Sequence, residues 1–242
     1  MISKNQLKLI RSLAQKKYRK QHQLFLVQGE KNVLELFDTP LVIHSLFVTE
    51  AFATLHQAKL ANLTYTLTDD ANLAKASTIV SNNAALAVVN IPPAELPNDS
   101  QWLIALDGVS DPGNLGTIIR VADWYGIKHI IASEACADPY NPKTISATMG
   151  SFARVSVTQV DLPVYLANSR QPIYGAYLGG ENVHRTQFSQ TGILLMGSES
   201  HGIGKEAGEH VTNKITIPAF GHAESLNVAM ATGIILDNIF RT

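Results

Sequence analysis

Short runs of apolar residues alternate with segments of helical periodicity along most of this 242-residue chain. Before residue 91, the apolar runs predict strands at 24–28, 40–50, 63–68 and 84–90, and the periodic segments predict helices at 31–37, 52–60 and 69–77. After residue 100, the predicted strands are 102–107, 127–133, 153–158, 173–178, 192–197 and 214–218. The predicted helices there are 114–125, 142–150, 161–169, 204–210 and 225–241.

The later strands consist of apolar residues without strict polar alternation. Strands of this kind are covered on both faces, so the pattern predicts an α/β fold with a mostly parallel sheet and helices on both faces. The earlier elements predict a small α/β domain of their own.

The segment 91–100 separates these two groups of elements. It contains three prolines in ten residues and is otherwise mostly polar, which suits neither a helix nor a central strand. We therefore expect a linker here, with an N-terminal domain at 1–97 and a larger domain at 98–242.

Charge is distributed unevenly. Residues 1–29 contain seven basic side chains and no acidic one, which leaves 12 basic and 20 acidic residues in the rest of the chain. The basic residues are Lys4, Lys8, Arg11, Lys16, Lys17, Arg19 and Lys20. They flank an apolar stripe of helical spacing: Leu7, Ile10, Leu13, Ala14 and Tyr18. A basic helix at 1–20 favours a polyanionic partner such as RNA, although a helix packed on its own domain with a solvated cationic face fits equally well.

Several classes of protein are excluded. A single cysteine, Cys136, permits no intramolecular disulfide and no CxxC metal site, and the eight histidines show no zinc-ligand spacing. No P-loop, dinucleotide-binding GxGxxG or GxSxG pattern is present. No apolar run reaches the roughly 18 residues of a membrane span, and no secretory signal opens the chain. We expect a soluble cytoplasmic protein without a metal.

Three polar clusters follow predicted strands of the second domain. In the first, 107–127, Asn114 suits a helix N-cap, and Arg120 lies off the buried stripe of that helix. In the second, 194–205, Glu199 stands in a glycine-rich turn where parallel strands end. In the third, 217–241, Ser225 suits the N-cap of an apolar helix whose small residues permit close packing, either within the chain or against a second subunit.

In this order, the three clusters resemble the three signature motifs of the SpoU (TrmH-like) branch of the SPOUT RNA methyltransferases. The matching segments are DPGNLGTIIRVAD, LLMGSESHGIG and IPAFGHAESLNVAMATG. More weakly, FLVQGEKNVLEL resembles the SpoU-type substrate-binding domain. The resemblance implies a trefoil-knotted SPOUT catalytic domain, a small L30e-like α/β RNA-binding domain before it, and a homodimer formed through the catalytic domain.

The resemblance also implies the chemistry, which is transfer of a methyl group from S-adenosylmethionine to a ribose 2′-hydroxyl of structured RNA. By motif position, the catalytic candidates are Asn114, Arg120, Glu199, Ser225 and Asn227. The cofactor-binding candidates are Met196, Gly197, Ile217 and Leu226. A separate N-terminal domain favours ribosomal RNA, most simply 23S, as the substrate. Two alternatives stay open, namely the same chemistry on transfer RNA and a non-catalytic RNA-binding ribosome assembly factor.

Overall fold

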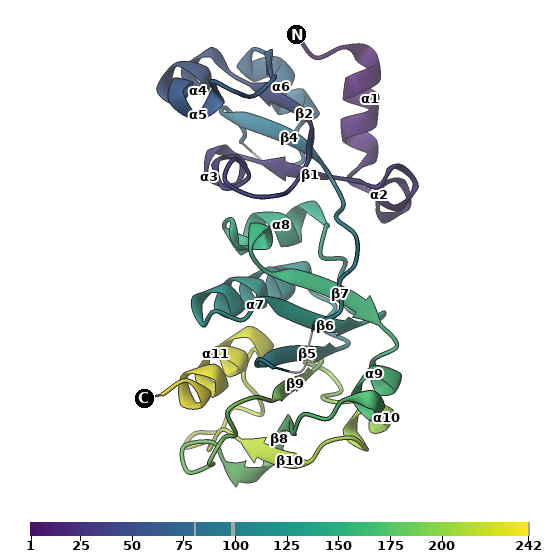
Figure 1. Cartoon of the computed structure of the whole chain (residues 1–242), viewed down its shortest axis with the longest axis vertical. Coiled ribbons are helices and arrows are strands. Elements are labelled where there is room, and N and C mark those ends of the chain that lie inside the picture. The colour runs from purple at the N-terminus through teal and green to yellow at the C-terminus, as the bar shows by residue number, and fades with distance from the viewer. Residues whose placement is uncertain (80, 98–99, 242) are drawn as a thin grey trace. The chain divides into compact units, whose positions relative to one another are not determined.

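The computed structural model describes residues 1–79, 81–97 and 100–241 (Figure 1). The chain divides into two compact units, one of Met1–Pro93 with Asp138–Ala153, the other of Ala94–Ala137 with Arg154–Thr242. Residues 91–97 form neither helix nor strand, as expected for a linker, whereas residues 98 and 99 of the predicted linker lie outside the described residues. In the described part of the chain, no helix has the length and apolar character that a membrane crossing requires.

The first unit is built on a four-stranded mixed sheet of order β1-β4-β2-β3. Its strands are β1 (Leu24–Gln28), β2 (Ile43–Val48), β3 (Thr66–Leu67) and β4 (Ala85–Asn90). Its helices are α1 (Lys4–Ser12), α2 (Lys16–His22), α3 (Glu30–Leu34), α4 (Glu50–Leu55), α5 (Gln57–Leu60), α6 (Asp70–Ala76) and α8 (Pro142–Thr148), followed by the short 3₁₀ helix η1 (Ser151–Ala153). All five residues of β1 are buried, because both faces of this sheet carry helices.

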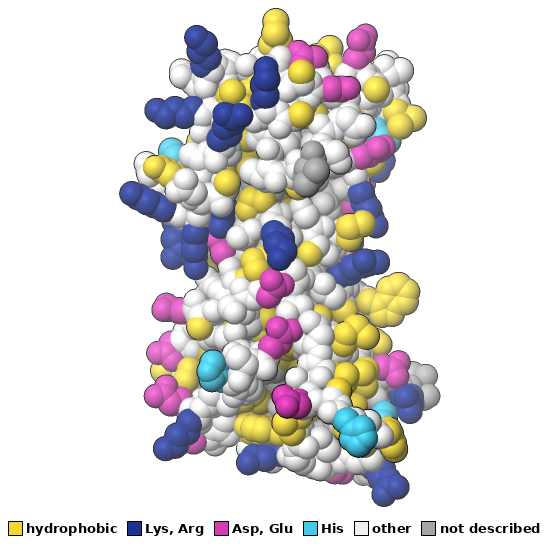
Figure 2. All heavy atoms as spheres, turned by 180° about the vertical axis from the view of Figure 1, so that it is seen from behind, with side chains coloured by type: hydrophobic (Ala, Val, Ile, Leu, Met, Phe, Trp, Pro, Cys, Tyr) yellow, Lys and Arg dark blue, Asp and Glu magenta, His cyan; other side chains and the backbone are white. Residues whose placement is uncertain are grey.

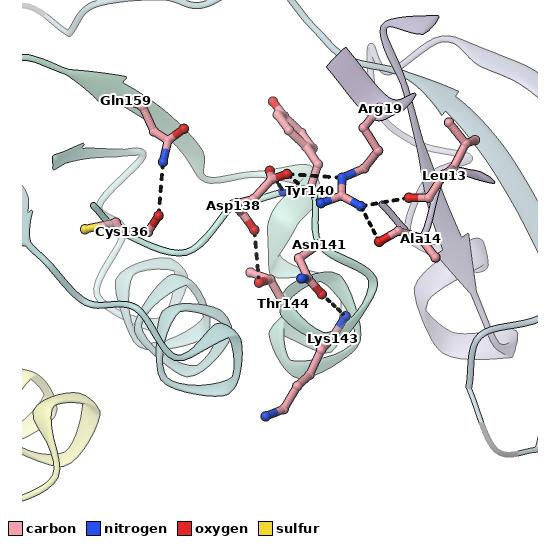
Figure 3. A network of polar contacts seen from close by, with 10 residues as sticks. All are labelled: Leu13, Ala14, Arg19, Cys136, Asp138, Tyr140, Asn141, Lys143, Thr144 and Gln159. Carbon is pink, nitrogen blue, oxygen red and sulfur yellow. Dashed lines mark hydrogen bonds and ion pairs between the residues drawn. The ribbon is translucent and has the colours of Figure 1, made fainter. Parts of the chain in front are cut away.

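The predicted basic helix at 1–20 is in fact two helices. Helix α1 packs its apolar side into the core through Ile10 and Leu13, which confirms that the basic segment belongs to its own domain. The chain then turns, and Ala14, predicted to be part of the apolar stripe, is exposed. Arg19 is only 2% exposed and donates from Nη1 to the carbonyl oxygens of Leu13 at 2.7 Å and Ala14 at 2.9 Å (Figure 3).

The guanidinium of Arg19 also donates to Asp138 Oδ2, from Nε at 3.1 Å and from Nη2 at 2.6 Å (Figure 3). Grouping Arg19 with the cations available to a polyanion was therefore wrong. This side chain instead holds the α1–α2 turn, because a buried guanidinium needs a counter-charge and acceptors for its N–H groups.

The segment 138–153 packs inside the first unit, although it follows strands of the second unit in sequence. Ile145 of α8 belongs to the core below β1, and Phe25 contacts the rings of Tyr140 and Phe152. Burial, with a smaller contribution from the charge of Asp138, raises the pKa of Tyr140 to about 12. The single boundary predicted after residue 97 does not include this return of a later segment to the first unit.

The second unit holds a six-stranded sheet of order β10-β8-β9-β5-β6-β7, and every pair of neighbouring strands is parallel. Its strands are β5 (Leu103–Asp107), β6 (His129–Ser133), β7 (Ser156–Val160), β8 (Ile173–Asn182), β9 (Ile193–Gly197) and β10 (Asn213–Thr216). Its helices are α7 (Pro112–Trp124), α9 (Leu162–Asn168), α10 (Lys205–Gly208) and α11 (Val228–Ile239). The predicted parallel sheet is confirmed.

Helices cover both faces of this sheet. Helices α7 and α11 pack on one face, where Ile118, Ile119, Ile235 and Leu236 lie in a large core, and α9 and α10 pack on the other. Helix α11 also packs directly on α7 (Figure 1). This arrangement brings the loops that begin both helices to the edge of the sheet where the strands end.

Candidate functional site

Loops that follow β5, β9 and β10 meet at the carboxyl edge of the parallel sheet. Asp107, the last residue of β5, accepts a hydrogen bond through Oδ2 from the backbone N–H of Gly204 at 2.8 Å. This bond fastens the loop after β9 to the end of β5, in the position where parallel α/β sheets commonly bind ligands.

The loop after β9 turns back very closely on itself. Ser198 and Gly202 exchange two backbone hydrogen bonds, of 3.0 and 2.9 Å. A Cβ atom at position 197 would lie 2.0 Å from the carbonyl carbon of Gly202, so only glycine fits there. Backbone atoms of this turn are thereby exposed to any ligand held at the strand ends.

Three predicted side chains form a closed set of hydrogen bonds across the three loops. Asn114 donates from Nδ2 to Glu199 Oε1 at 2.8 Å. Asn227 donates from Nδ2 to the same Glu199 oxygen at 2.9 Å and to Asn114 Oδ1 at 3.0 Å. We call Asn114, Glu199 and Asn227 the polar triad. The structure thus brings together one candidate from each of the three sequence clusters.

Both predicted helix caps are wrong by two or three residues. Asp111, not Asn114, caps α7 by accepting the N–H of Asn114 at 2.8 Å. Asn227, not Ser225, caps α11 by accepting the N–H groups of Ala229 and Met230 at 3.0 and 3.3 Å. Ser, Asn and Asp all favour the N-cap position, so the residue type alone does not decide which of them begins each helix.

A cavity of about 840 Å³ opens beside the polar triad, within the size range of small-molecule sites. Its walls are the segments 176–179, 196–203 and 214–221, the residues that lead into α11, and side chains of α11 itself. Six predicted residues line it: Met196, Gly197, Glu199, Ile217, Ser225 and Leu226. Asn114 and Asn227 reach the cavity wall only through Glu199.

Arg120 stands apart from the cavity lining. It is exposed on α7, and its guanidinium makes no hydrogen bond or ion pair with the described residues. A guanidinium without a partner among the described residues, on the helix that carries Asn114, can bind a phosphate group of an incoming substrate.

Sequence reasoning missed the part of the cavity that β8 contributes. Tyr177 and Leu178 line the wall, and Lys214 of β10 places Nζ 5.1 Å from the centre of the Tyr177 ring. Burial raises the pKa of Tyr177. These residues lie outside the polar clusters. An expected strand that ends at 178 gave no reason to connect them with the site.

The residues present fit a nucleoside better than a metal ion. Met196 is buried, and together with Ile217 and Leu226 it offers apolar surface for a flat ring, while the tight turn after Gly197 offers backbone groups. Across the described residues, no group of three or more His, Cys, Asp or Glu side chains is placed to hold a metal.

The family of this fold and site follows from comparison with known proteins. Residues 101–237 match the SpoU rRNA Methylase family, and residues 4–87 match the MRM3-like substrate binding domain. The chain belongs to the SpoU rRNA methylase family.

Particular relatives extend this match over nearly the whole chain. The 23S rRNA (guanosine(2553)-2′-O)-methyltransferase RlmP of Bacillus subtilis is 31% identical over 230 residues, covering 93% of this chain and 92% of that protein. The 23S rRNA (guanosine-2′-O-)-methyltransferase RlmB of Escherichia coli is 34% identical over 143 residues, 57% of this chain and 59% of that protein.

Solved structures share this fold. A putative RNA methyltransferase of the TrmH family from Porphyromonas gingivalis has a TM-score of 0.88 and 35% identity, covering 100% of this chain and 99% of its own. An AdoMet-bound rRNA methyltransferase from Sinorhizobium meliloti has a TM-score of 0.87 and 28% identity, covering 100% and 97%.

Proposed function

We propose that this protein transfers a methyl group from S-adenosylmethionine to a ribose 2′-hydroxyl of 23S ribosomal RNA, and that it does so in the cytoplasm, where that substrate is found. The observation that carries this proposal is the polar triad at the wall of the cavity, assembled from the three motif loops of the SpoU family. The RlmP relative named for this reaction on 23S RNA matches the chain almost end to end.

Transfer RNA is the alternative substrate. The A. aeolicus TrmH/SpoU tRNA modifying enzyme covers only 59% of this chain, with a TM-score of 0.50. The 23S relative covers 93%. Coverage of nearly the whole chain, including the substrate-binding match at 4–87, favours ribosomal RNA.

The cofactor would lie in the cavity, with Met196, Ile217 and Leu226 against its nucleoside and the backbone after Gly197 around it. When bound, S-adenosylmethionine supplies a methyl group already activated by a sulfonium. This chain's part is then to position the ribose and to ease removal of the 2′-hydroxyl proton.

Arg120 eases removal of the 2′-hydroxyl proton through its positive charge. A guanidinium keeps its proton in proteins, so we assign Arg120 the role of binding the phosphate beside the target ribose and stabilising negative charge on the 2′-oxygen. Ser225 offers an exposed hydroxyl at the cavity wall for orienting the ribose. The polar triad links Asn114, near the start of the helix that carries Arg120, to Asn227, two residues after Ser225.

Asn227→Asp tests the triad separately from the helix cap. Aspartate still accepts the N–H groups of α11, but it brings a second carboxylate next to Glu199, and like charges at such separations cost about 1–4 kcal/mol. We expect binding of S-adenosylhomocysteine, measured by calorimetry, to weaken at least tenfold. Asn227→Ser, which keeps the cap without the added charge, should lose less. Equal affinities for wild type and Asn227→Asp would contradict the role of the triad.

The RNA-binding surface of the first unit is defined by its exposed cations. Lys4, Lys8 and Arg11 lie one helical turn apart on the solvent side of α1, and Lys16, Lys17 and Lys20 continue on α2. Lys and Arg side chains stand out along one side of the part of the molecule that carries these helices (Figure 2). We propose that this basic stripe contacts RNA phosphates.

The triple variant Lys4→Gln, Lys8→Gln, Lys20→Gln should weaken RNA binding and leave cofactor binding unchanged. Each lost phosphate contact lowers the slope of log affinity against log salt by about 0.7–0.9. The slope, measured by filter binding, should therefore fall in magnitude by about two to three for the three lost contacts. Lys59→Gln is the matched control, because Lys59 already pairs with Asp38 at 3.8 Å. An unchanged slope in the triple variant would place the RNA elsewhere.

Two finer features of the fold belong to this proposal. The first unit takes the L30e-like form, and the C-terminal part of the catalytic domain forms a trefoil knot. The chain leaves β10 at the edge of the sheet and returns past the β9 loop to place α11 on α7, which supports such a threading. Tracing this path in a crystal structure tests the knot.

A homodimer through the catalytic domain is supported by exposed apolar side chains on two packed helices. Trp124 of α7 is 85% exposed and Met230 of α11 is 62% exposed. A second copy would cover them. Sedimentation of the purified protein tests this, and a monomer at micromolar concentration would refute it.

The decisive test of function is single-turnover transfer of labelled methyl to total RNA from cells that lack this protein. Label recovered as a 2′-O-methyl nucleoside in 23S RNA is the expected result. Label in transfer RNA would overturn the substrate. Cofactor and RNA binding without any label would favour the non-catalytic assembly factor.

A further inference from the structure

Phe220 is the most exposed large apolar side chain among the described residues. It is 97% exposed, and it lies at the cavity wall in the loop between β10 and α11. Full burial of a phenylalanine side chain yields about 1.5–3 kcal/mol, which this residue gains nowhere in the chain itself. Isolated exposed apolar residues are common, so its position beside the site is what calls for explanation.

The loop around Phe220 is held only at its ends. Val183 donates to the carbonyl of Thr216, and Asn227 caps α11, but residues 217–226 make no hydrogen bond or ion pair within the described part of the chain. A Cβ at Gly221 would meet nothing within 4 Å. The ring of Phe220, 97% exposed, lies in open space a few residues before Ser225 and Leu226.

We propose that Phe220 is a stacking platform for an unpaired RNA base at the methylated nucleotide or its neighbour. This inference rests on the proposed function, which brings a ribose to the same cavity. A ribose at the cavity carries its base with it, and proteins that recognise unpaired RNA commonly stack such bases on aromatic rings. An aliphatic side chain provides apolar surface but no flat π face.

The test uses the full-length protein, unmodified 23S RNA transcribed in vitro, and three variants. Phe220→Ala should weaken RNA binding about 5- to 150-fold, the range that loss of one stacked base gives. Phe220→Tyr should stay within threefold of wild type, and Phe220→Leu should lose nearly as much as alanine. Val164→Ala is the matched control, because Val164 is 56% exposed in the same unit but does not line the cavity.

Other outcomes separate the alternatives. Equal RNA affinity in Phe220→Ala and wild type, or full affinity in Phe220→Leu, overturns the stacking role. Weaker S-adenosylhomocysteine binding in Phe220→Ala would make the ring part of the cofactor site, and a changed sedimentation coefficient would make it a subunit contact. Both results also overturn the proposal. Methyl transfer by wild type is measured separately, so that failure of the proposed function is distinguishable.

Discussion

Replacing Arg120 with alanine is expected to reduce methyl transfer about 10²–10³-fold, the usual effect of losing one group that stabilises charge in a transition state. Arg120 is exposed and makes no contact with the described residues that would stabilise the fold. It does not line the cavity, so affinity for S-adenosylhomocysteine should stay within twofold of wild type. Single-turnover rates and calorimetry on the same protein preparation measure both quantities.

Arg120→Lys then separates positive charge from guanidinium geometry. Lysine keeps the charge but cannot bind a phosphate through two parallel N–H groups. Recovery to near wild-type rates would show that charge alone suffices, and a rate close to that of alanine would assign the effect to bidentate binding. Arg170→Ala is the control, since Arg170 is also exposed and unpaired among the described residues of this unit. A folded Arg120→Ala protein with more than a third of wild-type activity would remove Arg120 from the mechanism.

The strands were predictable because apolar runs report burial directly. All ten predicted strands are present among the described residues, and all six in the second unit are parallel. Several strands differ in length from the prediction: for example, β3 is only Thr66–Leu67 of the predicted 63–68, and β8 continues to Asn182 through the polar segment 179–182. Its last residues pair with Ile215 and Thr216 of β10, a partnership that no local pattern encodes.

The polar triad was predictable in its members but not in its bonds. Asn114, Glu199 and Asn227 each follow the end of a parallel strand, and such ends meet at one edge of a sheet. The N-cap positions could not be predicted, because two polar residues stand near the start of each helix and either of them could cap it. The role proposed for Phe220 could not be predicted from the sequence for a different reason. Only the structure shows that this aromatic side chain is exposed at the cavity wall.

Arg19 shows why charge alone misleads. In the sequence it is one of seven cations in a segment without acids, and its counter-ion Asp138 is 119 positions away. The same guanidinium lies at the turn between the two N-terminal helices and joins it to the segment 138–153, which is part of the first unit. Removal of residues 1–97 would therefore take away the packing partners of Ile145 and Tyr140 and expose the apolar surface of these two side chains.

Asp138→Ala is expected to destabilise the first unit by about 3–5 kcal/mol, because it leaves the buried Arg19 guanidinium without its carboxylate. The pair is 2% and 12% exposed, and its shortest contact is 2.6 Å. The exposed pair Lys59–Asp38 of the same unit is the matched control, with side chains 52% and 86% exposed. Lys59→Ala should cost less than about 0.5 kcal/mol, as solvent-exposed ion pairs contribute little.

A double variant, Arg19→Met with Asp138→Leu, distinguishes a buried unpaired charge from general damage to the packing. Removing both charges should restore most of the stability, because replacing a buried ion pair by apolar residues is often neutral. A deficit of about 1 kcal/mol should remain, since Asp138 Oδ1 also accepts the N–H of Tyr140 at 2.9 Å. RNA binding by the double variant should keep the wild-type salt slope, because Arg19 contacts no solvent-side partner.

The measurement must report on the first unit alone. Both tryptophans, Trp102 and Trp124, belong to the second unit, so their fluorescence would miss a local loss of stability. Hydrogen exchange at the amides of β1 and β4 reads the first unit directly, since these paired strands form the centre of its core. If Asp138→Ala left their protection unchanged, or lowered it no more than Lys59→Ala does, the ion pair would not be what holds the α1–α2 turn to α8.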